Sequence, residues 1–555
     1  MSTSTNQVRL PPPAQLVRGL AGAAPSDLSR APLLGILGVI VGAGIVTLTG
    51  RMLTLGLPDL KGHLGIGFDD GAWIGSVYNC ALMFMGPLTV FLGGWLGPRR
   101  ILLVCAAGFT LICCSLPLIH NYGFLIAALI LAGLTSGTFY PLTLTFALRN
   151  IPLKYLPFTL ALYATFVDMS VNIAPSLYGW YRDHFSWQWM FWNSAVITPA
   201  MMICIYYGIP AVSPPKKSSP APSLKGLLYA SLSFALLFAA LDQGERLDWW
   251  RSGLFTSLTV AGLIFLLAAF VRRLRGPNPL IQLTFLLSPN TLLMGTVLLL
   301  FRFCLLATII VIPQSLTVKG FEADQIGPAV VWTAAAQLAV ACAAALLLLR
   351  KLDSRLLMAV GFACIACACV MNSTFTSTWA AENYYRTELL MAVGQSFAFV
   401  GLVATIVLNA IFSGAMLSTP AVLTYSAYFH LARLFGGQLG VALMTHFIAH
   451  GEKVHSNLLG LHVQHGTWIT DGGVTALAAG LFAKSSGIAA ATGSALGVVG
   501  GRLRLQAYTL TFIDGFHLIA FACVLALLVI ALVGKSPLDY GDVGASQEGI
   551  GRQNG

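Results

Sequence analysis

Long apolar segments separated by short polar connections run through most of the chain. About fourteen of them can be counted, and each is close to the ~20 residues that an α-helix needs to cross a bilayer. The expected spans lie roughly at 33–55, 72–95, 100–119, 122–148, 155–179, 188–210, 225–242, 252–271, 288–313, 326–349, 355–376, 386–413, 420–449 and 509–534. The pattern therefore predicts an all-α polytopic membrane protein with fourteen transmembrane helices.

Charged side chains lie mainly in the connections, and their sign alternates from one connection to the next. The basic set comprises Arg99, Arg100, Arg149, Lys154, Lys216, Lys217, Lys225, Arg272, Arg273, Arg275, Arg350, Lys351 and Arg355, with Asp353 as its only acid. The acidic set comprises Asp59, Asp69, Asp70, Asp183, Asp242, Glu245, Asp248, Glu322, Asp324, Glu382 and Glu388. Short basic connections are retained in the cytoplasm. We therefore expect a multi-pass protein of a bacterial inner membrane with both termini cytoplasmic.

Composition excludes a soluble globular protein, since 57% of the 555 residues are hydrophobic and only 9% are charged. The formal net charge of +11 comes from basic residues that stand in twos and threes between apolar segments. This arrangement is typical of loops that are retained in the cytoplasm and contact anionic lipid headgroups. The expected partner is therefore the lipid bilayer and not a nucleic acid.

No pattern typical of an enzyme or of an ATP-driven pump occurs in the sequence: HExxH, GxSxG and a Walker-type glycine-rich loop are all missing. The eleven cysteines fall in or beside apolar segments, and Cys364, Cys367 and Cys369 have no histidine or acidic residue nearby. We expect no metal, no cofactor and no enzymatic activity. A membrane-embedded enzyme or sensor is kept as a remote alternative.

The connections divide the spans into groups of six, two and six. We expect a flexible cytoplasmic tail at 1–30, an N-terminal six-helix bundle at 31–212, a linker with two extra helices at 213–276, a C-terminal six-helix bundle at 277–535, and a cytoplasmic tail at 536–555. Two bundles with a helix pair between them suit a rocking transporter, whose substrate site lies between the halves near the membrane midplane.

One long connection, 450–506, interrupts the pattern of short loops. It contains His455, His462 and His465, and its later part is rich in glycine, serine and alanine. We interpret it as a periplasmic excursion with one or two amphipathic helices. A fifteenth span is the alternative, but an even number of spans is needed to keep both ends on the same side.

Four stretches carry a resemblance to a known family. They are Ala174–Trp180 with Ser186–Phe191; Gly133, Gly137 and Pro141; Arg433–Gly440; and Gln506–Ala507 through Asp514–Phe516. In order and spacing the chain resembles the major facilitator superfamily, and within it the fourteen-span drug:proton antiporter branch that includes EmrB-type multidrug exporters. The resemblance implies a secondary transporter, together with a periplasmic membrane fusion adaptor and an outer-membrane channel as possible partners.

The chain departs from that family at three positions. The connection after the second span keeps Gly97 and Arg100 but has no acid before them, and Leu129 stands where the family usually has an arginine. The first span reads Leu48–Arg51 where an acid is often found. Proton coupling is therefore expected to depend on other residues.

Three charges, Asp168, Arg302 and Arg433, lie deep in apolar spans, where each costs at least about 2.5–3.5 kcal/mol and needs a partner or a function. Asp168 is the first proton-coupling candidate, and Asn172 shares its helical face at i+4; a structural Asp–Arg pair is the alternative. Arg302, the lone cation of the ninth span, is a candidate for binding an anionic substrate or pairing with an acid. Its alternative is snorkelling towards the lipid surface.

Further candidates lie nearer the ends of spans or beside glycines. Arg51 could bind substrate or pair with Asp59, and Arg433, with His430 three residues before it, could bind substrate or cap a helix. Asp514 and His517 are spaced for a proton relay or for a structural pair. The residues expected to serve gating and helix packing are Pro175, Gly179, Gly97, Arg100, Gly436 and Gly440.

Together these features predict a secondary transporter that exports amphipathic or aromatic compounds by alternating access and draws on the proton gradient. The cations Arg302 and Arg433 outnumber the deep acids, which favours anionic substrates. Uptake or facilitated exchange of organic anions on the same fold is the alternative.

Overall fold

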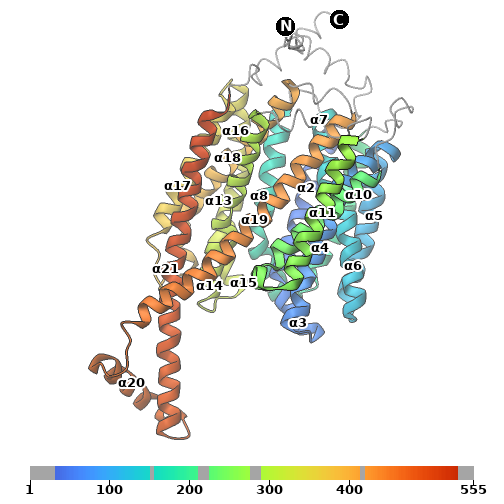
Figure 1. The fold of residues 1–555 in the computed structure, drawn as a ribbon. Helices are drawn as coiled ribbons and strands as arrows, with labels where there is room; N and C mark the ends of the chain where they lie inside the picture. The colour runs from blue at the N-terminus through green and yellow to red at the C-terminus, as the bar shows by residue number, and fades with distance from the viewer. Residues whose placement is uncertain (1–31, 151–155, 210–223, 276–288, 413–418, 535–555) are drawn as a thin grey trace, which may run out of the picture.

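The computed structural model describes residues 32–150, 156–209, 224–275, 289–412 and 419–534, and these contain helices but no strand. Fourteen of the described helices are long and apolar enough to cross a membrane (Figure 1). The predicted all-α fold with fourteen membrane-spanning helices is thereby confirmed. The expected tails at 1–30 and 536–555 and the start of the expected linker at 213–276 lie outside the described residues.

The helices fall into three groups along the chain. The N-terminal half contains α2 (Pro32–Leu55), α3 (Leu57–Leu64), α4 (Phe68–Leu96), α5 (Pro98–Ser115), α6 (Tyr122–Ser136), α7 (Phe139–Asn150), α8 (Leu156–His184) and α9 (Trp189–Gly208). The central pair is α10 (Leu224–Gln243) and α11 (Gly253–Arg275). The C-terminal half contains α13 (Pro289–Cys304), α14 (Ile312–Thr317), α15 (Ala323–Ile326), α16 (Pro328–Leu349), α17 (Ser354–Asn372), α18 (Tyr385–Phe412), α19 (Thr419–Gly460), α20 (Trp468–Leu481) and α21 (Ile488–Leu532).

Short single-turn elements complete the described chain. They are η1 (Leu116–Leu118), η3 (Trp249–Arg251), the π-helical η4 (Ala307–Val311), η5 (Ala381–Tyr384) and η6 (Phe482–Lys484). Elements of the two halves meet mainly through α8 against α16 and α18, and through α19 against α4 and α7. Helix α10 of the central pair packs on both α4 and α19.

Local sequence sets several helix ends. Asn121 accepts hydrogen bonds from the backbone N–H groups of Gly123 and Phe124, which caps the start of α6. Gly97, between α4 and α5, has φ +87°, a conformation that side chains disfavour. No described atom outside the immediate chain would touch a Cβ at Gly97, so its backbone conformation and not the lack of space calls for glycine here.

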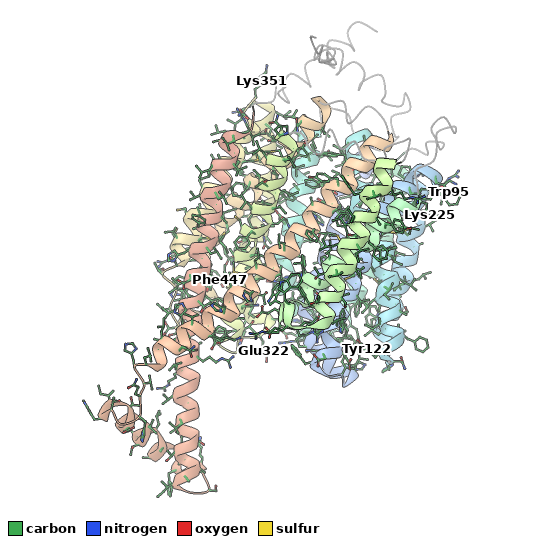
Figure 2. All side chains as sticks on the ribbon, in the orientation of Figure 1. Trp95, Tyr122, Lys225, Glu322, Lys351 and Phe447 are labelled. Carbon is green, nitrogen blue, oxygen red and sulfur yellow. The ribbon has the colours of Figure 1, made fainter. Side chains whose placement is uncertain are left out.

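Figure 2 shows Lys351 and Glu322 at opposite ends of the helix bundle. Two acids expected in the connections are instead partly or fully covered: Asp242 lies near the end of α10 and is half-buried, and Glu388 lies in the first turn of α18 and is 2% exposed. Hydropathy alone could not separate these two from solvated acids, because both sit at the edge of an apolar segment.

The long connection 450–506, expected as an excursion with one or two helices, is largely helical. Helix α19 continues to Gly460 and α21 already begins at Ile488, so most of the segment is an extension of the two spans. One separate long helix, α20, packs against α21. Figure 1 shows α20 and the first half of α21 projecting beyond the other helices. Among the described residues, no cluster of histidines, cysteines and acids suited to a metal occurs.

Candidate functional site

Five side chains from four helices form a buried charged cluster between the two halves. Asp168 comes from the middle of α8 and Tyr140 from α7, while Arg302 lies in the last turn of α13 and His430 and Arg433 lie in α19. Asp168 is 1% exposed and Arg433 is 2% exposed. Both arginines act electrostatically on Asp168, so the structure brings these separate charges together.

The polar atoms of this central cluster are largely unpaired. Within the described chain, the two carboxylate oxygens of Asp168, both ring nitrogens of His430, the Tyr140 hydroxyl and several guanidinium nitrogens of Arg302 and Arg433 have no hydrogen-bond partner. Buried polar groups are nearly always hydrogen-bonded. These atoms are therefore the ones in the described chain that are available to a proton, water or substrate.

An aromatic platform positions Arg433. The guanidinium carbon lies 4.1 Å from the centre of the Tyr140 ring, and the His430 ring stacks on the same Tyr140 ring at 5.0 Å. Tyr163 of α8 packs against Tyr140 at 5.4 Å and donates a 3.3 Å hydrogen bond to its carbonyl oxygen. Because cation–π contacts are strongest when they are desolvated, the Tyr140 ring helps to hold a buried cation in place.

Arg302 lies against Gly437, within the glycine-rich stretch Arg433–Gly440 expected to allow close helix packing. A Cβ at Gly437 would lie 2.8 Å from Nη2 of Arg302, so a larger residue there would displace the guanidinium. The neighbouring Gly436 faces the Leu299 side chain, whereas a Cβ at Gly440 would make ordinary contacts of 3.4 Å or more. Glycines 436 and 437 thus allow α19 to approach α13 closely.

Asn172 does not lie open to the central cluster. Its Nδ2 donates to Oε1 of Gln395 at 2.8 Å and to Oε1 of Gln337 at 3.4 Å. Gln395 in turn donates to Thr308 Oγ1 at 3.0 Å. The expected substrate-binding amide is therefore engaged in a polar bridge from α8 to α16 and α18, which joins the two halves.

Arg51 does not pair with Asp59. Its Nη2 donates instead to the carbonyl oxygen of Ile309 at 2.8 Å, in the π-helical turn η4 of the C-terminal half. Asp59 accepts a hydrogen bond from the hydroxyl of Tyr178. Of the two alternatives for Arg51, the pair with Asp59 is not formed, because α8 and η4 offer both groups partners that are distant in sequence.

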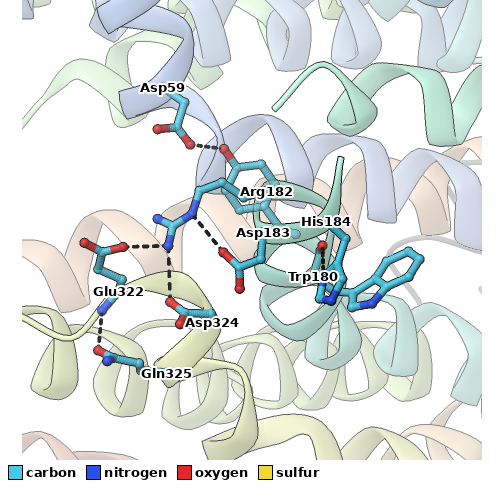
Figure 3. Close-up of polar contacts among 9 residues, drawn as sticks. Asp59, Trp180, Arg182, Asp183, His184, Glu322, Asp324 and Gln325 are labelled. Carbon is cyan, nitrogen blue, oxygen red and sulfur yellow. Dashed lines mark hydrogen bonds and ion pairs between the residues drawn. The ribbon is translucent and has the colours of Figure 1, made fainter. Parts of the chain in front are cut away.

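A second set of charges joins the halves at the end that carries Glu322 (Figure 3). Arg182, at the end of α8, lies 2.5 Å from Glu322 and 3.3 Å from Asp324, and 3.7 Å from its neighbour Asp183. A Cβ on Gly179 would lie 2.6 Å from the Asp324 Cα. Gly179, expected to serve helix packing, therefore permits α15 to reach α8, while Pro175 lies buried inside α8.

The remaining candidates lie apart from the central cluster. Asp514 bonds to His455 at 2.8 Å and not to His517, and both Asp514 and His517 are exposed. The expected i,i+3 relay is therefore not formed. Arg100 is exposed, whereas the adjacent Arg99 donates to the Tyr206 carbonyl oxygen at 2.6 Å.

Several residues around the central cluster were not among the sequence candidates. Tyr140 and Tyr163 carry no charge, and nothing in the apolar pattern distinguishes them from packing residues. Arg182 lies at the end of α8, between the two motif stretches Ala174–Trp180 and Ser186–Phe191, but its partners belong to the C-terminal half. The sequence hinted at such partners only through the acids Glu322 and Asp324 around the start of α15.

The fold and the site define a polytopic helical transporter. The sequence matches the profile described as Major Facilitator Superfamily over residues 39–441. The chain belongs to the major facilitator superfamily, and it is a membrane transporter and not an enzyme.

Individual relatives are multidrug and resistance proteins at modest identity. The chain is 29% identical to the probable multidrug resistance protein EmrY of Escherichia coli (strain K12), over 42% of this chain and 46% of EmrY, about half of that protein's length. It is 23% identical to the multidrug export protein EmrB of Haemophilus influenzae, over 75% and 80% of the two chains. It is also 23% identical to the fatty acid resistance protein FarB of Neisseria gonorrhoeae, over 88% and 93%.

A solved structure shares the fold. The proton:xylose symporter XylE superposes with a TM-score of 0.53 at 11% sequence identity, covering 94% of this chain and 99% of that one. At this identity the likeness concerns the fold alone.

Proposed function

We propose that this chain exports amphipathic organic compounds across a bacterial inner membrane by alternating access, and that Asp168 couples the export to the proton gradient. The observation that carries the proposal is the buried, unpaired carboxylate of Asp168 beside Arg302 and Arg433. A carboxyl in such a place changes its proton occupancy when its surroundings change between water and protein.

The position of Asp168 links its charge to the movement of the halves. Asp168 belongs to α8 of the N-terminal half, and both arginines belong to the C-terminal half. The deprotonated carboxylate attracts the arginines across the interface, and protonation removes that attraction. The proton affinity of Asp168 therefore differs between the arrangements of the two halves in which the cluster is open to one side or to the other. Such a difference is the requirement for coupling.

The relatives support export. EmrB is named as a multidrug export protein and FarB as a fatty acid resistance protein. These names support the proposal that this chain transports amphipathic substrates. The termini are placed in the cytoplasm from the basic connections. The projecting α20 and the start of α21 would then lie on the periplasmic side, within reach of a membrane fusion adaptor and an outer-membrane channel.

Transport in proteoliposomes tests the proposal. Purified protein is reconstituted, a pH gradient is imposed, and the movement of a fluorescent amphipathic compound is followed. We expect Asp168→Asn to abolish the movement of the compound that the pH gradient drives. The exchange of substrate between the two sides of the membrane, measured at equal substrate concentrations, should remain. Asp183→Asn, an exposed acid on the same helix, serves as the control. Gradient-driven transport that survives in Asp168→Asn would falsify the coupling role.

Uptake or exchange of organic anions is a second candidate function. It is favoured by the charge of the central cluster, in which two arginines face one carboxylate. A substrate cation would compete with a proton for Asp168, whereas an anion bound to the arginines would stabilise the protonated form. An anion and a proton would therefore bind together, as in cotransport.

Recording internal pH in the same liposomes separates the two functions. Proton-coupled export, the first function, predicts that protons and substrate cross the membrane in opposite directions. Uptake of an anion together with a proton, the second function, predicts that both enter together. The comparison is made with a cationic and an anionic fluorescent substrate of similar size, so that only the charge differs.

A further inference from the structure

We propose that Arg51 is a positioning residue that holds the π-helical turn η4, and that this turn is a hinge of the transport movement. In the described arrangement Arg51 of the N-terminal half keeps the turn in its wide form. When the halves part, the turn loses this partner and closes to a regular α-helical turn. The proposal rests on the proposed alternating access, but it depends neither on proton coupling nor on the identity of the substrate.

The turn η4 interrupts its span shortly after the arginine of the central cluster. Helix α13 ends at Cys304, two residues after Arg302, and α14 begins at Ile312. The N–H group of Ile312 donates to the carbonyl oxygen of Ala307, five residues earlier, whereas an α-helix uses the partner four residues earlier. Single π-turns inside α-helices are rare and occur often at functional sites. The span therefore carries one extra residue at this point.

Two contacts tie the N-terminal half to this turn. Nη2 of Arg51, on α2, donates to the carbonyl oxygen of Ile309 at 2.8 Å. Gln395 of α18 donates to Thr308 Oγ1 at 3.0 Å, and it accepts a hydrogen bond from Asn172 of α8 at 2.8 Å. Two adjacent residues of the turn are thus connected to the N-terminal half, one directly and one through α18. Both connections are lost when the halves separate at this position.

The positive charge of Arg51 has no acidic partner. Among the described residues no acid forms an ion pair with it, and its Nε is buried without a hydrogen bond. Asp59, the nearest acid in the sequence, accepts from Tyr178 instead. A cation in an apolar span is costly, yet a charged donor makes a stronger bond than a neutral one and regains water when it is released. The charge therefore suits a contact that forms in one arrangement of the halves and is hydrated in another.

Closing the turn would rotate the two parts of the span against each other. One residue corresponds to about 100° of rotation in an α-helix. When the extra residue of η4 is taken up into α-helical turns, α14 turns by this angle relative to α13, which carries Arg302. Arg302 acts electrostatically on Asp168 of the other half. The hinge thus links the parting of the halves to the central cluster.

Hydrogen–deuterium exchange of α15 in the full-length protein tests the role of Arg51. Helix α15 follows α14 and packs on α8, so its exchange reports whether the halves part near the turn. Arg51→Leu removes a charge-assisted contact and should raise this exchange by about ten-fold. Arg51→Lys keeps a cationic donor and should keep most of the protection. Arg99→Leu is the matched control, because Arg99 also donates to a carbonyl oxygen, that of Tyr206, but within its own half.

Deleting Ile309 tests the turn itself. A π-turn contains one residue more than the α-helical form, so the deletion makes the span continuous and keeps the faces of α13 and α14 in register. The protein should therefore fold, with a melting temperature near that of the unmodified protein. Deleting Leu299, within the regular part of α13, should lower the melting temperature strongly. In the Ile309 deletion, Arg51→Leu should add nothing to the exchange of α15, whereas independent contributions would add.

Substrate exchange in liposomes, measured at equal concentrations on both sides, tests the hinge. The Ile309 deletion should slow this exchange by about ten-fold or more, because the span can no longer change its register. Arg51→Leu keeps the turn and should retain substrate exchange.

Normal substrate exchange in the deletion variant would overturn the hinge. Unchanged exchange of α15 in Arg51→Leu, or effects of Arg51→Leu and the deletion that add, would overturn the role of Arg51. If the melting and hydrogen-exchange results hold while the unmodified protein moves no amphipathic compound in liposomes, the contact of Arg51 with the turn stands and the proposed function fails.

Discussion

Nη2 of Arg182 in α8 lies 2.5 Å from Oε2 of Glu322 in the connection before α15, so one ion pair joins the two halves of the transporter. Asp324 adds a second contact at 3.3 Å (Figure 3). Asp183 is the sequence neighbour of Arg182 on α8, so its contact does not connect the two halves. The halves are thus held together at one end by charges and, in the middle, by the polar bridge of Asn172.

We predict that Arg182→Ala loosens this end. A partly exposed pair contributes up to about 1 kcal/mol, which corresponds to about a five-fold change in the open population. Hydrogen–deuterium exchange of Ala323–Ile326 should rise by about that factor. Asp183→Ala should leave exchange unchanged, and the double reversal Arg182→Glu with Glu322→Arg should restore protection. Equal exchange in Arg182→Ala and the unmodified protein would exclude a closing role.

Gly179→Ala should open the same end by a different route. The added Cβ would press on the Asp324 backbone, which cannot turn aside like a flexible side chain. Overpacking of this kind costs about 1–3 kcal/mol, so exchange in α15 should rise and transport should slow. The matched control is Gly75→Ala in α4, because no described atom lies within 4 Å of a Cβ there. A Gly179→Ala protein with unaltered exchange would contradict the close approach.

The Tyr140 ring, and not its hydroxyl, is expected to matter for Arg433. Tyr140→Leu removes the face over which the guanidinium lies, and a desolvated cation–π contact is worth about 2 kcal/mol. Substrate affinity should therefore fall by about ten- to thirty-fold. Tyr140→Phe keeps the ring and should stay within about two-fold, since the hydroxyl has no hydrogen bond to any described residue. Equal losses in both variants would assign the effect to the hydroxyl.

A half-buried carboxylate ties the central helix pair to both halves. Asp242 of α10 accepts a hydrogen bond from Ser76 of α4 and another, 2.8 Å long, from Gln438 of α19. Nearby, Glu245 lies 2.7 Å from His446 of α19, and Arg246 lies 2.6 Å from Asp69 of α4. The connection of α10 to α11 therefore bridges the line where α4 and α19 meet.

Asp242→Leu should destabilise the protein markedly. It removes an acceptor shared by the buried Ser76 hydroxyl and the half-buried Gln438 amide, and the loss of such an acceptor costs about 1–3 kcal/mol. We expect a melting temperature several degrees lower, measured by intrinsic fluorescence in detergent. Asp242→Asn should lose less, because its amide oxygen can still accept a bond. Asp248→Asn, an exposed acid of the same hairpin, is the control, and a normal melting temperature for Asp242→Leu would refute the bridging role.

Much of the architecture was predictable from the chain itself. The lengths of the apolar segments gave fourteen spans, and the bilayer thickness is the physical reason, since it sets how many apolar residues a helix needs. The same reasoning singled out Asp168, Arg302 and Arg433, because a charge inside an apolar segment is costly and stands out. The order of motifs also indicated the family that the profile match over residues 39–441 confirms.

The partners of those charges were decided by the tertiary structure. Arg51 bonds to η4 and not to Asp59, Asn172 bonds to Gln395, and Asp514 bonds to His455 and not to His517. Spacing along one helix predicts only which residues share a face. Which face meets which neighbour depends on the rotation of each helix and on the packing of helices far apart in sequence.

The acids at the ends of spans and the long connection show the same division. Charge patterning grouped Asp242 and Glu388 with the acids of the connections, although both stand at the ends of apolar segments, since such a pattern measures only local composition. The fold buries Glu388, half-buries Asp242 and continues the helices α19 and α21 beyond the bundle. The sequence by itself determined how many helices cross the membrane and which of them carry deep charges. Only the packing of the two halves decided that Asp168, Arg302 and Arg433 meet, because that meeting requires contacts between three helices that no local pattern encodes.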